Sequence, residues 1–148
     1  MLTKFCEIRY THSPSAGLSR GRNLGITTAR NDFLVIIDDD MYADGSWLTN
    51  IVKALDMGGA QRVISGQVKP FFSNNAGGFV PSIITSEKPA SYRGRINADV
   101  LYTGNMAIHR TAFDAVSLFD EQLGPGSGFP GVEDSDLGFR LLDAGFDR

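Results

Sequence analysis

The chain has 148 residues, of which 42% are hydrophobic and 21% charged, and its formal net charge is −3. This composition predicts one folded domain over residues 1–148, and the acidic balance gives no indication of a nucleic-acid partner. The longest apolar run, Phe33–Ile37, is far shorter than the roughly 20 residues of a membrane helix, so no membrane segment is expected. The single Cys6 cannot form an internal disulfide, which favours a cytoplasmic location.

Strand-like and helix-like segments alternate along the chain. The expected elements are strands at 5–10, 33–37, 62–68 and 100–108, and helices from 19 to 31, from 46 to 57, at 111–116 and at 132–144. This alternation predicts an open α/β sheet, in which ligands bind beyond the carboxyl ends of the strands. The continuous apolar run at 33–37 fits a central strand buried on both faces. The irregular stretch 69–99 is long enough to be a lid or binding loop.

Three consecutive aspartates follow the strand at 33–37. If the strand alternation continues through them, Asp38 and Asp40 lie on one side and Asp39 on the other. Three neighbouring carboxylates repel one another unless a cation, an arginine or a hydrogen-bonding ligand offsets their charge. Carboxylate oxygens suit Mg²⁺ or Mn²⁺, which complete their shells with substrate phosphate. A solvated acidic turn is the alternative interpretation, but the position at the end of a buried strand favours a metal–phosphate site.

Two other segments carry candidate chemistry. Residues 17–25 open a helix with three glycines and with Arg20 and Arg22, but they lack both the dinucleotide-binding fingerprint and the Gly-Lys-Ser/Thr ending of a phosphate loop. Residues 133–136 place acidic side chains in the first turn of the last helix. These either oppose the helix dipole or supply a general base above the sheet.

Taken together and in order, these segments resemble a family 2 glycosyltransferase of the GT-A fold, a nucleotide-diphospho-sugar transferase with helices on both faces of a Rossmann-like sheet. The segments that carry the resemblance are Gly17–Ile26, Phe33–Asp40 followed by Trp47–Leu48, Thr103–Arg110, Phe119–Glu121, Glu133–Leu141 and Ala144–Phe146. Their order and spacing cover nearly the whole chain. Any one of them alone would be ambiguous.

The resemblance implies roles for particular residues. Asp38, Asp39 and Asp40 match the family's Asp-x-Asp motif, in which Asp40 would coordinate Mn²⁺ or Mg²⁺ together with Asp38, while Asp38 or Asp39 would contact the nucleoside. Arg22 and Asn23 match an Arg-Asn pair that helps to hold the nucleotide.

On the other side of the implied site, Gly104 and Asn105 match the strand that lines the donor sugar and the acceptor. Asp134 matches the catalytic base, which would deprotonate the acceptor hydroxyl as it attacks the anomeric carbon. That displacement inverts the anomeric configuration. The implied partners are therefore a nucleotide sugar and a carbohydrate or other hydroxyl acceptor.

The chain also departs from the family pattern. Nothing in it matches the usual first strand and helix, and it stops where the family continues into another strand, so the domain is expected to be truncated at both ends. Two alternatives remain open. One is a non-catalytic remnant of such a domain that needs a partner chain or a homo-oligomer. The other is a phosphatase-like enzyme with an aspartate nucleophile, which Met41 and Tyr42 disfavour because small and hydroxyl residues are expected there.

Overall fold

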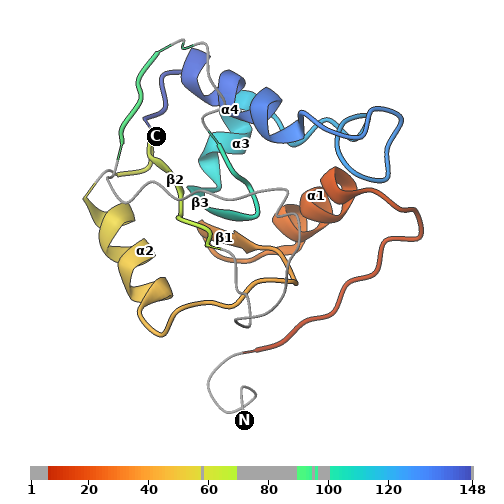
Figure 1. The fold of residues 1–148 in the computed structure, drawn as a ribbon, viewed down its shortest axis with the longest axis horizontal. Helices are drawn as coiled ribbons and strands as arrows, with labels where there is room; N and C mark the ends of the chain where they lie inside the picture. The colour runs from red at the N-terminus through yellow and green to blue at the C-terminus, as the bar shows by residue number, and fades with distance from the viewer. Residues whose placement is uncertain (1–6, 58, 70–89, 95, 97–100, 148) are drawn as a thin grey trace, which may run out of the picture. The chain divides into compact units, whose positions relative to one another are not determined.

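The structure is a computed structural model that describes residues 7–57, 59–69, 90–94, 96 and 101–147 (Figure 1). The chain forms two compact units. The first comprises residues 1–30 and 119–133, and the second comprises residues 31–118 and 134–148. Within the described ranges, no helix is both long enough and apolar enough to cross a membrane.

The first unit is built around helix α1 (Leu18–Thr28) and the loop 119–133. No side chain caps the N-terminus of α1, so its first N–H groups need other acceptors. The main-chain N–H of Leu18 donates to the carbonyl of Pro125 at 2.9 Å, and the Ser19 hydroxyl donates to the carbonyl of Leu123 at 2.7 Å. The loop therefore provides an acceptor for the first of these N–H groups and a further contact with the Ser19 hydroxyl.

The second unit contains a three-stranded sheet with the order β1-β3-β2. Strands β1 (Phe33–Ile37) and β2 (Val63–Ser65) each pair antiparallel with β3 (Asn105–His109). Because both flanking strands run opposite to β3, they run in the same direction as each other. The carboxyl ends of β1 and β2 therefore lie at the same end of the sheet as the start of β3.

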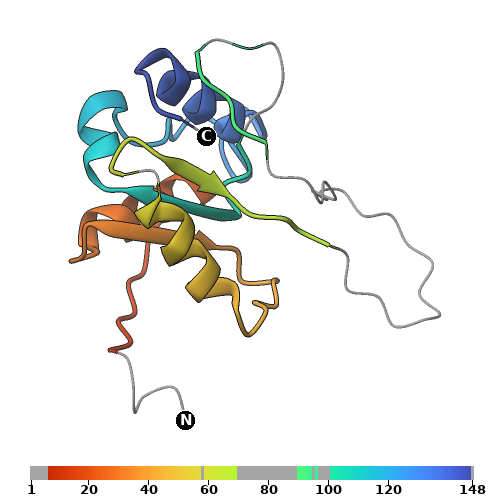
Figure 2. The same ribbon diagram turned by 90° about the vertical axis from the view of Figure 1, so that its left-hand side faces the viewer.

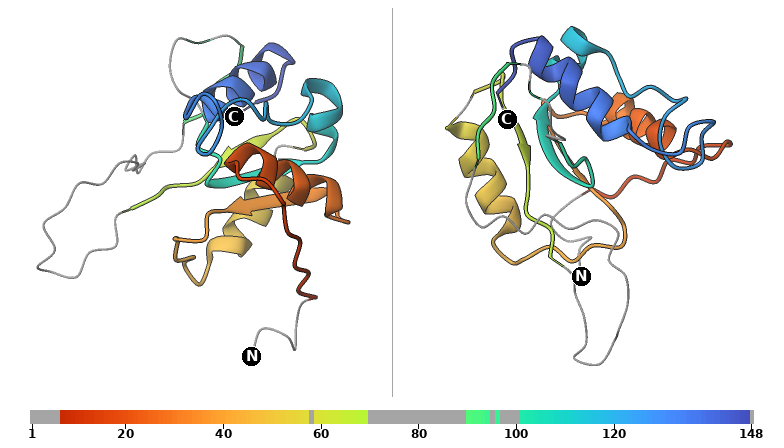
Figure 3. Two further views of the ribbon diagram at one scale, coloured as in Figure 1. Left: turned by 90° about the vertical axis from the view of Figure 1, so that its right-hand side faces the viewer. Right: turned by 45° about the horizontal axis from the view of Figure 1, so that its top comes forward.

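Helices of the second unit lie on both faces of this sheet. On one face, Ile51 and Leu55 of α2 (Trp47–Asp56) pack against Ala107 of β3. Helices α3 (Thr111–Val116) and α4 (Glu133–Asp143) lie on the opposite side of the sheet from α2 (Figures 2 and 3). This arrangement encloses β3, whose Met106 and Ile108 have no exposed surface. The core of this unit is therefore centred on β3.

Several elements have the bounds and burial that the sequence predicts. The strand at 33–37 and the helix at 111–116 are confirmed with the same bounds. The last helix is also confirmed, and its predicted apolar stripe is buried (Leu137, Leu141 and Leu142). It is followed by Gly145 with φ +85°, the left-handed conformation expected of a residue that ends a helix.

Other expectations about the sheet are wrong. Among the residues that the structure describes, β1 is an edge strand rather than a central one, and its two ends, Phe33 and Ile37, are 47% and 39% exposed. A continuous apolar run does not by itself reveal where a strand lies in a sheet, and here β3 takes the central place. Residues 7–10 form no strand, and residues 5 and 6 of the predicted first strand lie outside the described residues. The fourth predicted strand begins only at Asn105, after Gly104, and β2 spans three residues.

Candidate active site

The polar residues of interest in the second unit meet at one end of its sheet. Ile37, the last residue of β1, pairs with Asn105, the first residue of β3. Just beyond this pair, the N–H of Asp38 donates to the carbonyl of Gly104 at 3.0 Å. On the other flank, the N–H of Gly66, which follows β2, donates to the carbonyl of Asn105 at 2.8 Å. We call this end of the sheet, formed by Asp38, Gly66 and residues 103–105, the rim.

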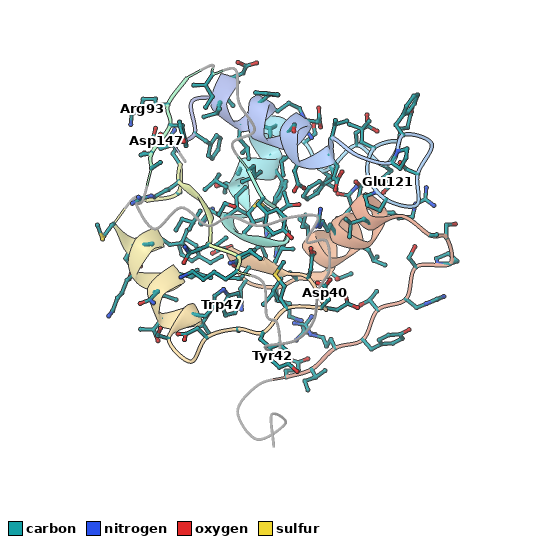
Figure 4. All side chains as sticks on the ribbon, viewed as in Figure 1. Asp40, Tyr42, Trp47, Arg93, Glu121 and Asp147 are labelled. Atoms are coloured by element: carbon teal, nitrogen blue, oxygen red, sulfur yellow. The ribbon has the colours of Figure 1, made fainter. Side chains whose placement is uncertain are left out.

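The aspartate triplet leaves the strand at once and forms a turn. The N–H of Met41 donates to the carbonyl of Asp38 at 3.3 Å, so the strand alternation expected for Asp38 and Asp40 does not apply. Asp38 is half-buried, whereas Asp39 and Asp40 are exposed. Figure 4 shows Asp40 on the segment that connects β1 with α2. The three carboxylates therefore have different surroundings, and Asp38 is the one packed into the rim.

The carboxylate of Asp38 lies directly over Gly104. A Cβ added to Gly104 would lie 2.3 Å from Asp38 Oδ2 and 2.9 Å from its Cγ. These separations are far below van der Waals contact, so only glycine leaves room for Asp38 in this position. The sequence singles out Gly104, and the structure gives its physical role at the rim.

A second carboxylate reaches the rim from α4. The N–H of Thr103 donates to Asp134 Oδ2 at 3.1 Å, and the Thr103 hydroxyl donates to Asp134 Oδ1. Thr103 is completely buried, and Asp134 is half-buried. Asp38 and Asp134 thus contact consecutive residues, Gly104 and Thr103. One carboxylate from each acidic cluster of the sequence therefore contacts this dipeptide.

Asn105 is fixed at the rim by both ends of its side-chain amide. The indole N–H of Trp47 donates to Asn105 Oδ1 at 3.0 Å, and Asn105 Nδ2 donates to the carbonyl of Gln67 at 3.2 Å. A Cβ at Gly66 would lie 2.4 Å from Asn105 Nδ2, so this glycine also serves close packing. The position of Trp47, half-buried and pointing its N–H at Asn105, is that of a structural residue.

Arg22 and Asn23 belong to the first unit, and their contacts there are specific. Asn23 Nδ2 donates to the carbonyl of Phe119 at 2.9 Å, and the N–H of Phe119 donates to Asn23 Oδ1 at 3.0 Å. The Arg22 guanidinium lies 3.7 Å from Glu133 Oε1 and over the ring of Phe119, 5.5 Å from its centre. Both residues are buried and join α1 to the loop 119–133. Their expected nucleotide contact stays a prediction.

Glu121 of the same loop is held by α1. The Arg20 Nε–H donates to Glu121 Oε2 at 2.9 Å, and Asn23 Nδ2 donates to Oε1 at 3.2 Å. The hydrogen bond from Arg20, and secondly that from Asn23, lower the pKa of Glu121. This exposed carboxylate therefore remains ionised to lower pH than an ordinary glutamate.

Sequence reasoning missed three residues that shape the rim: Thr103, Gly66 and the indole of Trp47. Thr103 and Trp47 occur in the segments that carry the family resemblance, but nothing in the sequence indicates that they hold Asp134 and Asn105. The one sequence signal for the close packing at position 66 is that the residue is glycine, and glycine also occurs in many turns. Pairings over 31 and 58 residues of sequence have no local signature.

The candidate metal ligands, Asp38 at the rim and Asp40 in the turn beside it, offer carboxylate oxygens. Among the residues that the structure describes, no group of three or more His, Cys, Asp or Glu side chains is placed to hold a metal ion. Mg²⁺ commonly uses only one or two protein carboxylates and takes its other ligands from water and substrate phosphates. The chemistry of Asp38 and Asp40 is compatible with that kind of site.

Comparison with known proteins identifies the family of the chain. The model of the family described as Glycosyl transferase family 2 matches residues 1–117. The chain belongs to this family. The matched range contains Asp38 to Asp40 and residues 103–105 of the rim and ends before Asp134. The resemblance seen in the sequence is confirmed, and the typical donor of the family is a nucleotide sugar.

One curated relative is similar to most of the chain. The succinoglycan biosynthesis protein ExoM of Rhizobium meliloti (strain 1021) is 31% identical over 132 residues, which is 88% of this chain. The aligned part is 41% of the length of ExoM, so the chain spans less than half of that relative. No solved structure matches the chain.

Proposed function

We propose that the chain transfers a sugar from a nucleoside diphosphate sugar to an acceptor hydroxyl with inversion, and that Asp134 is the catalytic base. The observation that supports this most is the contact of Asp38 and Asp134 with the consecutive residues Gly104 and Thr103. Donor binding and proton removal need separate acidic groups within the length of one sugar. In this proposal Asp38 serves the donor and Asp134 removes the proton.

Asp134 has the chemistry that a base requires. A carboxylate can accept about four hydrogen bonds, so the two that Thr103 donates are compatible with an acceptor hydroxyl as a further donor. Proton transfer to the carboxylate makes the hydroxyl oxygen a stronger nucleophile as it attacks the anomeric carbon. The bond to the diphosphate breaks on the opposite side of that carbon, which gives inversion.

On the donor side, Asp38 and Asp40 are the residues that would hold Mn²⁺ or Mg²⁺, and Asp38 or Asp39 would contact the nucleoside. When bound, the metal neutralises negative charge on the leaving diphosphate. Gly104 and Asn105 would line the sugar, and Trp47 keeps the Asn105 amide in one orientation. We also propose nucleotide contacts for Arg22 and Asn23 of the first unit, as the family resemblance implies.

The wider setting of this activity is also a proposal. The name of the relative, which refers to succinoglycan biosynthesis, supports a glycan as the acceptor. The residues that we expect to choose the acceptor, 69–99, lie mostly outside the described residues. The single Cys6 supports a cytoplasmic location, and a homo-oligomer is the proposed assembly if the chain alone lacks activity.

The decisive variant is Asp134→Asn, which keeps the shape of the side chain and removes its basicity. We expect release of nucleoside diphosphate from a panel of uridine, guanosine and thymidine diphosphate sugars to fall about 10²- to 10⁴-fold. Affinity for the matching nucleoside diphosphate should stay within about twofold, because the donor contacts are at Asp38 to Asp40.

The matched control is Asp143→Asn, at the exposed end of the same helix, which should leave turnover unchanged. Turnover by Asp134→Asn at the wild-type rate would contradict the assigned base. Equal loss of turnover and of nucleotide affinity would also contradict it.

A further inference from the structure

Thr103 sits at the point where Asp134 meets the sheet. It comes two residues before β3, and its side chain has no exposed surface. Two hydrogen bonds join the neighbouring Tyr102 to Ser65 of β2. The N–H of Tyr102 donates to Ser65 Oγ, and the Ser65 hydroxyl donates to the carbonyl of Tyr102, each at 3.0 Å. The peptide that precedes Thr103 is thus fixed to β2.

Thr103 donates to both oxygens of one carboxylate. Its N–H binds Asp134 Oδ2 at 3.1 Å and its hydroxyl binds Oδ1. Two donors on two oxygens set the plane of the carboxylate as well as its position, which a single hydrogen bond cannot do. A β-branched side chain has few rotamers, so the buried hydroxyl is held in place before any substrate arrives.

We propose that Thr103 is the positioning residue for the catalytic base, which it holds in one plane through its hydroxyl and its main-chain N–H. This inference rests on the proposed function of Asp134. Because Gly104 is the next residue and contacts Asp38, the same short segment sets the spacing between the base and the donor-binding carboxylate. Thr103 itself touches no substrate.

Two variants separate the hydroxyl from the rest of the side chain. Thr103→Val keeps the branched shape and removes the donor to Oδ1, whereas Thr103→Ser keeps the donor and removes a methyl group. We expect Thr103→Val to lower kcat for nucleoside diphosphate release about ten- to hundredfold, with KM for the nucleotide sugar within about threefold. Thr103→Ser should recover most of kcat.

The control is Thr49→Val, the same change at an exposed position of α2, which should leave kcat unchanged. Wild-type kcat in Thr103→Val would overturn the inference, and so would an equal loss in the valine and serine variants. If Thr103→Val does not fold, the Thr103→Ser variant still tests the inference, which requires near-normal kcat when the hydroxyl is present. A complete loss of kcat in Thr103→Ser would then overturn it.

The parallel Asp134→Asn variant distinguishes this inference from the function on which it rests. An inactive Asp134→Asn beside a fully active Thr103→Val overturns only the role of Thr103. A fully active Asp134→Asn overturns the base and, with it, any positioning of that base.

Discussion

In the first unit, Asn23 uses both ends of its amide on the main chain of Phe119, and Arg22 pairs with Glu133 while it covers the ring of Phe119. In the second unit, Asp38 and Asp134 are held at the rim by main-chain groups and one hydroxyl, with the exposed Asp39 and Asp40 beside them. The contrast shows that the polar residues in the family's motifs have two kinds of role. Arg22 and Asn23 bind a loop to a helix, whereas Asp38 and Asp134 place carboxylates at the rim.

The largest effect on stability is expected from Asn23→Ala in the first unit. The change leaves the buried N–H and carbonyl of Phe119 without these partners, which should lower the free energy of unfolding by about 2–4 kcal/mol. Urea unfolding measures it, with Asn50→Ala on the exposed face of α2 as the control. Unchanged stability would contradict this structural role of Asn23, and a weakened affinity for nucleoside diphosphate would support its proposed nucleotide contact.

The next effect is expected from Gly104→Ala at the rim. Its new Cβ would displace the Asp38 carboxylate and press on Tyr102, so we expect a loss of about 1–3 kcal/mol in stability and about a tenfold weaker affinity for nucleoside diphosphate. Fluorescence of Trp47, the single tryptophan of the chain, can follow the binding.

Gly25→Ala in α1 is the matched control, because nothing lies within 4 Å of its new Cβ. A helical glycine replaced by alanine in open space should raise stability by about 0.5–1 kcal/mol. If the two alanine variants had the same stability and the same affinity for nucleoside diphosphate, the close approach of Asp38 to Gly104 would contribute to neither quantity.

The smallest effect is expected from Glu121 and depends on pH. The pKa of this carboxylate is lowered in the folded chain, first by the hydrogen bond from Arg20. Its contribution to stability is therefore complete above the ordinary glutamate pKa of about 4.3 and disappears as the pH falls through the lower folded pKa. Unfolding at pH 7 and at pH 3 should show a smaller acid-induced loss in Glu121→Gln than in the wild type. Identical losses would mean that the Arg20–Glu121 pair contributes nothing to the free energy of unfolding.

Local features can be predicted from the sequence better than the pairing of distant ones. The apolar run Phe33–Ile37 between aspartates marks both ends of β1, but its place at the edge of the sheet depends on β3, more than 60 residues later. The family pattern points to the site residues Asp38 and Asp134. It gives no role to Thr103, because the hydrogen bond that defines this residue spans 31 residues and involves a side chain common in any buried loop.

The proposed function requires that the donor binds beside Asp38 and Asp40 and within reach of Asp134. Crystals of the chain soaked with a nucleoside diphosphate and Mn²⁺ test this requirement most directly. We predict density for the diphosphate and the metal at the turn after β1, on the side of the rim where Thr103 holds Asp134. Nucleotide density confined to the first unit, in the groove that Arg9 and Tyr10 form with α1, would contradict it.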